Sequence, residues 1–248
     1  MFIIWPGQSN RPGVIVSIMQ YYPIFLDIKD RNCLVVGGGD VGTRKVEMLL
    51  ECGASVTVVS LDASETLKRL FEDQRITLVT RAYRPSDLDN SFLIIGATND
   101  ERLNQQLSMD AEKCNLLCNI ADRPAACNFI LPAIVQQGDL VMAISTSGKS
   151  PAFAKKLRKD LEKQFGEAYA VFLNLMGSIR NRLLLEKHAP EQHKPLFQKI
   201  IYSDIISWIQ NRQFKEIDRL LLDVLGPGYT VDELLKPDFS HNETKGAK

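Results

Sequence analysis

The chain has 248 residues, enough for one large domain or for a nucleotide-binding domain with a smaller appendix. With 45% hydrophobic and 24% charged residues, it has the composition of an ordinary globular protein, which excludes the disordered and collagen-like classes. Thirty basic and thirty acidic side chains give a formal net charge of zero, so we expect neither nucleic acid nor an anionic membrane as a partner.

The sequence also limits where the protein works. No apolar run reaches the length of about 18 residues that a membrane helix needs. Residues 1–18 lack a basic start and contain Pro6 and Pro12, so they make a poor signal peptide; we expect a loose extension, with Met19 as an alternative start. The five cysteines are scattered, without zinc-ligand spacing, so we predict no metal site and a cytoplasmic protein with reduced thiols.

Residues 19–120 alternate short apolar runs with helical stretches, which is the pattern of a parallel α/β domain, and we predict that this domain covers residues 19–131. The runs are apolar throughout, as in strands that helices cover on both faces. Strands are predicted at 33–36, 56–59, 76–79, 92–97 and 116–120, and helices at 41–51, 65–72 and 101–113. We therefore predict a Rossmann-type, doubly wound sheet.

Past Ile120 the pattern changes. Two apolar runs, 129–135 and 140–144, flank a Gln-Gly-Asp turn signal and predict extra strands outside the main sheet. Ser150 as N-cap and Pro151 at the first helical position predict a helix start. The next apolar residues recur every fourth position and predict one buried helix face: Phe153, Leu157, Leu161 and Phe165. Further helices are predicted at 168–187, 195–211 and 214–224.

Gly37, Gly39 and Gly42 form a GxGxxG array directly after a predicted strand and at the start of a helix. In dinucleotide-binding domains the first glycine makes the tight turn, the second lets the pyrophosphate approach the backbone, and the third lets helix and strand pack closely. The helix N-terminus adds unpaired N–H groups and the positive end of its dipole. The array predicts a bound dinucleotide; a similar turn that has lost its ligand is the alternative.

The ends of the second and fourth strands supply further candidates. An acidic residue about 20 residues beyond the glycines normally holds the adenosine ribose. Here the first acid is Asp62, displaced from the usual position, and no arginine stands beside it to receive a 2′-phosphate, which favours NAD over NADP. Ala97 and Thr98, at the end of the fourth strand, are small enough for a backbone that passes beside the cofactor. An ordinary strand end with no role in binding explains these small residues equally well.

Asn119, Asp122 and Asn128 lie around the end of the fifth strand, at the edge where open α/β sheets bind ligands. Asp122 is the one carboxylate of this stretch, so it is a candidate general base for a step in which a hydride leaves. An aspartate in a turn before proline is the alternative. The three histidines lie far along the chain, in the predicted helical region or at its end.

The segment STSGKSP precedes the helix start at Ser150. Its polar residues are candidates for binding carboxylates or phosphate, and simple capping of the helix explains them equally well; they are Ser145, Thr146, Ser147 and Lys149. The basic residues between Lys149 and Lys159 either meet an anion or form a solvated helix face.

Several segments together resemble one family. YYPIFLDIKDRNCLVVGGGDVGTRKVEMLLECGASVTVV, GATND, CNIADRPAACNFILPAIV and ISTSGKSPAFAKKLRKDLE are similar, in order and spacing, to the precorrin-2 dehydrogenase and sirohydrochlorin ferrochelatase module of siroheme synthases. The resemblance covers residues 20–165 well and the helical remainder loosely. We expect the methyltransferase domain that some siroheme synthases carry to be absent, because the chain is too short for it.

The resemblance implies that NAD+ takes a hydride from the tetrapyrrole precorrin-2, giving sirohydrochlorin, and that bifunctional members insert Fe2+ as a substrate ion in the same pocket. The family's essential aspartate, the proton acceptor, corresponds to Asp122. Its NAD contacts correspond to residues beside the glycines and after the second strand, so the full predicted set is Gly37, Gly38, Gly39, Asp40, Val41, Gly42, Leu61, Asp62, Ala97 and Thr98. Many members have alanine in place of Gly42, a small-for-small difference that puts nothing in the resemblance in doubt.

The resemblance also implies a homodimer formed through residues 132–163 and a helical domain beyond it, over 164–235. The composition of residues 236–248 predicts a disordered tail. The many carboxylates of a tetrapyrrole give the basic residues near Lys149 a possible partner. Two alternatives stay open: a non-catalytic Rossmann protein that senses NAD, and a dehydrogenase of another small molecule.

Overall fold

The structure is a computed structural model that describes residues 20–185 and 190–236. The predictions for the N-terminal extension and for the tail beyond 236 lie outside the described residues. The chain divides into two compact units, Met1–Leu131 and Pro132–Lys248.

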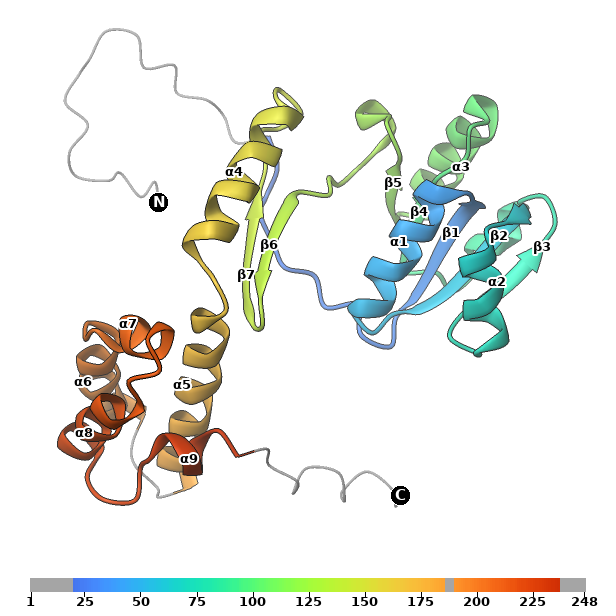
Figure 1. Cartoon of the computed structure of the whole chain (residues 1–248). Helices are drawn as coiled ribbons and strands as arrows, with labels where there is room; N and C mark the ends of the chain where they lie inside the picture. Colours follow the sequence, from blue (N-terminus) through green and yellow to red (C-terminus); the bar gives the residue numbers. More distant parts are fainter. Residues whose placement is uncertain (1–19, 186–189, 237–248) are drawn as a thin grey trace, which may run out of the picture. The chain divides into compact units, whose positions relative to one another are not determined.

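The first unit is built on a five-stranded parallel sheet with the order β3-β2-β1-β4-β5, which confirms the predicted Rossmann-type fold (Figure 1). The strands are β1 (Asn32–Gly38), β2 (Ser55–Ala63), β3 (Thr77–Thr80), β4 (Leu93–Gly96) and β5 (Leu117–Ile120). The chain runs outward from β1 through β2 to β3 and then returns to the other side of β1. The direction of winding therefore switches between β1 and β4, and open sheets bind ligands beyond the carboxyl ends of the strands at such a point.

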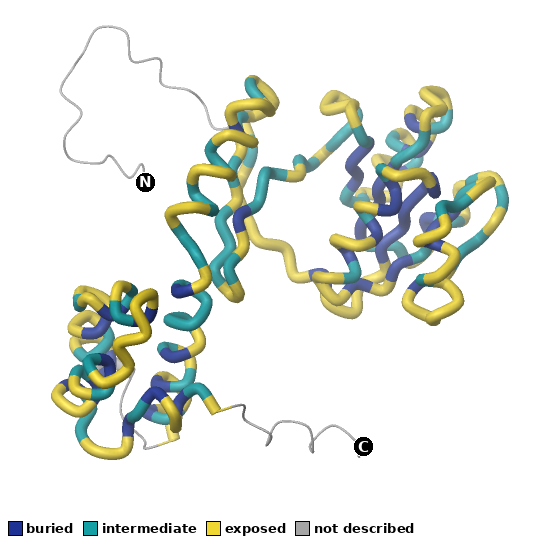
Figure 2. Tube along the Cα trace, in the orientation of Figure 1, coloured by how far each residue is buried: buried dark blue, intermediate teal, exposed yellow. Residues whose placement is uncertain are grey.

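Helices cover both faces of this sheet. They are α1 (Asp40–Glu51), α2 (Glu65–Glu72) and α3 (Glu101–Lys113), with the short 3-10 helices η1 (Pro85–Leu88) and η2 (Pro124–Ala126). One core joins the sheet to Val46 and Leu67, on α1 and α2, and a second joins it to Leu107 on α3. Burial on two faces explains why the strands are apolar throughout, and Figure 2 shows the buried residues concentrated along them.

The second unit begins with the antiparallel hairpin of β6 (Ala133–Gln137) and β7 (Leu140–Ile144), against which α4 (Pro151–Gln164) packs. The predicted helix start is confirmed, because the Ser150 hydroxyl accepts a hydrogen bond from the N–H of Phe153. The prediction that Phe153 is buried is wrong: the residue is 50% exposed, and the buried residue is the neighbouring Ala154. A two-stranded hairpin covers only a narrow stripe of the helix.

The remaining helices form their own core. They are α5 (Ala168–Leu185), α6 (Pro190–Ile201), α7 (Ile205–Gln210), α8 (Phe214–Leu225) and α9 (Val231–Leu234). The single helix predicted at 195–211 is in fact two, because the Ser203 hydroxyl donates to the carbonyl of Ile200 and ends the first of them. No helix in the described ranges is long and apolar enough to cross a membrane.

Candidate functional site

A crevice of about 730 Å³ opens at the carboxyl ends of β1 to β4, at the point where the winding switches. The turn between β1 and α1 forms one wall, and the ends of β2, β3 and β4 form the others. All of the predicted cofactor-binding residues line this crevice except Gly42 and Asp62. The crevice residues absent from the prediction include Ser60, Arg81, Tyr83, Asp100 and Arg102.

The glycine turn has the geometry that a dinucleotide requires. Gly37 has a φ of +117°, and a Cβ on it would lie 2.4 Å from the carbonyl oxygen of Ala97, so only glycine suits this position. Beside Gly39, by contrast, no heavy atom of the described chain outside the turn lies within 4 Å of a Cβ position, so the room there is open. Gly39 also begins α1 without a side-chain cap from any described residue. An open space beside uncapped helical N–H groups suits a diphosphate.

Two serines and a threonine hold this turn against the second strand. The Ser60 hydroxyl accepts a hydrogen bond of 2.9 Å from the N–H of Gly38, and the hydroxyls of Thr43 and Ser64 lie 2.8 Å apart. The only signal for Ser60 in the sequence is a polar residue at the end of an apolar run. These hydrogen bonds tie the glycine turn and the start of α1 to the end of β2 and the residue that follows it.

Asp62 lies within β2, which extends to Ala63 and is therefore longer than predicted. Its carboxylate accepts a hydrogen bond of 2.8 Å from the N–H of Ala63, and at this point the crevice wall consists of Ser60 and Leu61. A contact between Asp62 and a ribose stays a prediction.

An ion pair lies beside the crevice at the end of β3. Two guanidinium nitrogens of Arg81 donate to the two carboxylate oxygens of Asp87, at 2.8 and 2.5 Å. The Asp87 side chain is 8% exposed and also accepts from the N–H of Arg84 at 2.8 Å. The bond from Arg81 holds the pKa of Asp87 below its ordinary value although burial opposes this. Asp87 lies six residues away, in η1, so the sequence carried no signal for this pair.

Residues after β4 form a second hydrogen-bonded corner. The Thr98 hydroxyl donates to the side-chain oxygen of the buried Asn104 at 3.0 Å, and the Asn104 amide donates to the carbonyl of Thr98 at 2.9 Å. Asp100 caps α3 by accepting from the N–H groups of Arg102 and Leu103. Thr98 is thereby fixed at the crevice.

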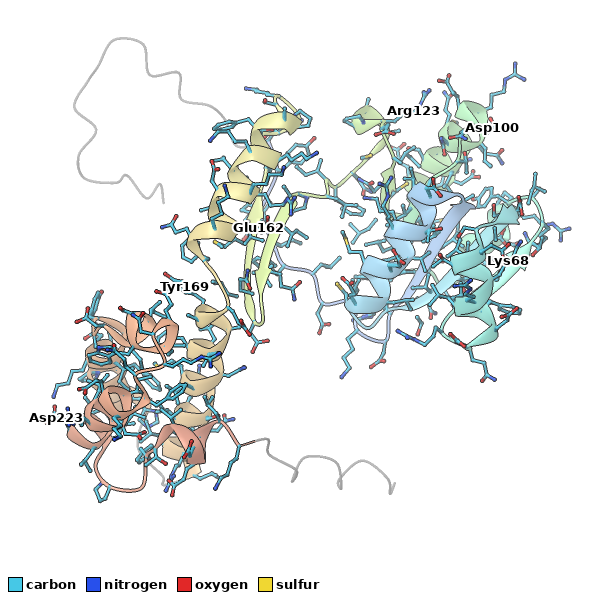
Figure 3. The ribbon with its side chains drawn as sticks, viewed as in Figure 1. Lys68, Asp100, Arg123, Glu162, Tyr169 and Asp223 are labelled. Atoms are coloured by element: carbon cyan, nitrogen blue, oxygen red, sulfur yellow. The ribbon has the colours of Figure 1, made fainter. Side chains whose placement is uncertain are left out.

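Asp122 follows β5 at the same edge of the sheet and is exposed. Its φ of +59° is unusual for a residue other than glycine. The turn around it is anchored, because the N–H of Ala121 donates to the carbonyl of Gly96 at 2.8 Å and the Arg123 guanidinium pairs with the carboxylate of Glu101. Figure 3 shows Arg123 and Asp100 on this edge.

Lys45 on α1 is a charged neighbour of Asp122 that the sequence did not single out. Burial lowers the pKa of this half-buried lysine, the charge of Arg44 lowers it further, and the carboxylate of Asp122 opposes both. A lysine on the first helix therefore lies within electrostatic reach of the aspartate beyond the fifth strand.

The predicted substrate residues Asn119 and Asn128 are engaged with the backbone. The Asn119 amide donates to the carbonyl of Phe129 at 3.0 Å. The Asn128 side chain accepts from the N–H of Cys118 and donates to the carbonyl of Leu116, both at 2.8 Å. These bonds hold the segment after η2 along β5, and contact of either asparagine with substrate stays a prediction.

The predicted anion-binding residues of STSGKSP belong to the second unit, between β7 and α4. The Thr146 hydroxyl accepts from the N–H of Ser150, and the Ser145 hydroxyl accepts from the N–H of Ser147, which has a φ of +52°. Lys149 continues this loop. On α4 itself, Lys156 pairs with Asp160 and Arg158 with Glu162. Part of the basic run therefore forms ion pairs along its own helix.

Together the sheet order, the glycine turn and the uncapped start of α1 define the first unit as a Rossmann-fold domain of the dinucleotide-binding class. The family described as putative NAD(P)-binding matches residues 24–133, and the family described as sirohaem biosynthesis protein central matches residues 137–164.

Relatives and a solved structure extend this likeness. Siroheme synthase 2 of Klebsiella pneumoniae is 37% identical over 186 residues, which are 75% of this chain and 41% of the relative. The siroheme synthase of Vesicomyosocius okutanii is 36% identical over 189 residues, 76% of this chain and 40% of the relative. The chain thus spans less than half the length of these relatives. The solved structure of SirC, precorrin-2 dehydrogenase, is 29% identical with a TM-score of 0.67, covering 80% of this chain and all of that one. The chain belongs to the family of the N-terminal module of siroheme synthases.

Proposed function

We propose that this chain oxidises precorrin-2 to sirohydrochlorin with NAD+ as the hydride acceptor. The observation that carries the proposal is a crevice lined by the glycine turn, with the carboxylate of Asp122 in an anchored turn at the same sheet edge. The likeness to SirC, precorrin-2 dehydrogenase, supports the choice of substrate.

The chain's residues divide the work between binding and proton transfer. The backbone at Gly39 and the start of α1 bind the diphosphate, while Ala97 and Thr98 bound the crevice on the side of β4. NAD+, when bound, supplies the hydride acceptor. The oxidation releases a hydride and a proton, and we assign the proton to the carboxylate of Asp122, from which it passes to water.

The backbone at Asp122 orients this carboxylate. Its φ of +59° is a conformation that aspartate tolerates better than most side chains, so the carboxylate keeps one direction only where neighbouring residues constrain the turn. The Arg123–Glu101 pair and the bond between Ala121 and Gly96 supply that constraint. Lys45 adds a positive charge near Asp122, suited to a substrate carboxylate.

We extend the proposal to the substrate contacts of the second unit. A tetrapyrrole with many carboxylates needs several donors, and the loop of Ser145, Thr146, Ser147 and Lys149 offers hydroxyls, N–H groups and an ammonium. Lys149→Met is expected to raise the KM for precorrin-2 while leaving the Kd for NAD+ unchanged. An unchanged KM would remove Lys149 from the binding site.

We also propose that the protein is a homodimer through residues 132–163. The hairpin has half-buried apolar residues, among them Val141 and Met142, and α4 leaves Phe153 half exposed. A two-stranded hairpin is marginal by itself, and a second copy would cover this surface. Sedimentation of the full chain is expected to give a dimer and of Phe153→Asp a monomer; a monomeric wild type at working concentration would contradict the proposal.

The test of the function is to mix the full chain with NAD+ and precorrin-2 and to follow NADH and tetrapyrrole absorbance together. The proposal predicts equal amounts of NADH and sirohydrochlorin. Binding of NAD+ without turnover would indicate an NAD sensor, and turnover of alcohols or hydroxy acids instead would indicate another dehydrogenase. Addition of Fe2+ or Co2+ to the product tests metal insertion, which stays a prediction.

A further inference from the structure

The wall of the crevice at the end of β3 carries a charge arrangement that bears on cofactor choice. In Rossmann domains the adenosine ribose lies at the end of the second strand, where an acid accepts from the 2′-hydroxyl or an arginine accommodates the 2′-phosphate of NADP. Here β2 pairs with β3 in a register that puts Ser60 opposite Thr80. The next residues along the two strands are Leu61 and Arg81, and both line the crevice.

The sequence around Asp62 contains no arginine, but the fold brings one to this place from β3. The guanidinium of Arg81 is already engaged within the chain, however. It gives two hydrogen bonds to Asp87 and one of 2.9 Å to the carbonyl of Ala82. The Asp87 carboxylate is buried and held in place by the N–H of Arg84.

A second arginine of the crevice, Arg102, lies in the first turn of α3, beyond β4. In the sheet order, β1 separates β4 from β2, so Arg102 stands on the other side of the glycine turn from Leu61. It therefore provides a matched control: an arginine of the same crevice away from the expected ribose position.

We propose that Asp87 is a cofactor-selecting residue, which favours NAD over NADP by holding the guanidinium of Arg81 that would otherwise bind a 2′-phosphate. This inference rests on the proposed function, since it assumes that the crevice binds a dinucleotide. A 2′-phosphate at this place meets a guanidinium that already uses three of its five N–H donors, and it also meets the negative charge of Asp87, which accepts from two of them. A guanidinium binds a phosphate through the same bidentate pair of hydrogen bonds that Arg81 makes with Asp87. The phosphate and the carboxylate therefore compete for the guanidinium of Arg81.

The experiment measures the Kd of NAD+ and of NADP+ without any tetrapyrrole, for the full-length wild type and for Asp87→Asn. The asparagine keeps the side-chain oxygen that accepts from Arg84 and removes the charge. We expect the Kd for NADP+ to fall about tenfold or more, the size of one charge-assisted hydrogen bond, with the Kd for NAD+ changed by less than about threefold. The double variant Asp87→Asn with Arg81→Gln is expected to lose the gain, and Asp87→Asn with Arg102→Gln to keep it.

A second variant does not depend on the fold's tolerance of a change at Asp87. Leu61→Arg places an arginine beside Arg81 at a position that is 76% exposed. Asp87 stays paired with Arg81 in this variant and leaves the new guanidinium to the cofactor. We expect it also to tighten NADP+ about tenfold or more. The inference would be overturned if the wild type bound NADP+ as tightly as NAD+, or if neither variant bound NADP+ more tightly than the wild type. In both cases NAD+ binding by the wild type would leave the proposed function standing. Absence of NAD+ binding by the wild type would instead overturn the proposed function.

Discussion

A Cβ atom on Gly42 would lie 2.1 Å from the carbonyl oxygen of Gly37. Helix α1 therefore rests on the turn that precedes it, and no side chain can stand between them. Gly42→Ala is expected to force the turn to move in this chain and to cost about 1–3 kcal/mol of stability. Urea unfolding of the protein without cofactor measures this. Equal stability would show that the turn shifts freely.

Gly39 is the matched contrast in the same turn, because its Cβ position is open and its φ of −78° suits any residue. Gly39→Ala and Gly39→Asp are expected to fold with nearly wild-type stability and to lose NAD+ affinity, the aspartate more severely because its charge opposes the diphosphate. Calorimetric titration with NAD+ checks this. Wild-type affinity in a folded Gly39→Asp protein would remove this turn from the cofactor site.

The Arg81–Asp87 pair predicts an acid-dependent part of stability. The pKa of Asp87 lies below its ordinary value of 3.8 in the folded protein, so the unfolded chain binds more protons as the pH falls through this range. The stabilisation is complete above a pH of about 5 and is lost as the pH falls through the lowered pKa. The stability difference between wild type and Asp87→Asn should therefore shrink towards low pH in urea unfolding. A difference independent of pH would mean that Asp87 acts only as a cap.

Lys45 reports on the charge of Asp122. Because the Asp122 carboxylate raises the pKa of Lys45 against burial and Arg44, Asp122→Asn is expected to lower the pKa of Lys45 further. NMR titration of the lysine side chains measures the change. Lys68 is the internal control, since its pKa is raised by Glu65. If the pKa values of both lysines shifted equally, or if that of Lys45 did not shift, the charge of Asp122 would not act on Lys45.

The strands and most helix ends were predictable because local physics decides them. Strands covered on both faces must be apolar, as Val35 and Ile94 are, and Asp100 and Ser64 cap helices with side chains that the sequence displays. The glycine turn was predictable for the same reason, since close backbone contacts at Gly37 and Gly42 exclude any side chain.

The remaining site residues depend on contacts that no local pattern carries. Arg81 meets Asp87 only because the chain after β3 returns in η1 and brings the two side chains together, and Lys45 approaches Asp122 only because β4 alone separates β1 from β5. The exposure of Phe153 likewise follows from how little of α4 the hairpin covers. Periodicity indicates which side of a helix is apolar, but the partner decides how much of that side is buried.

The most direct test of the account is the rate of NADH formation from precorrin-2 at saturating NAD+, for wild type, Asp122→Asn and Asp122→Ala. Asparagine keeps the volume of the side chain but cannot accept the proton, so it separates charge from shape. We predict wild-type NAD+ affinity in both variants, with oxidation slower by about 10²–10⁴, the usual effect of losing a general base. Turnover of precorrin-2 by both variants at the wild-type rate would contradict the account and leave Asp122 as a residue of the turn after β5.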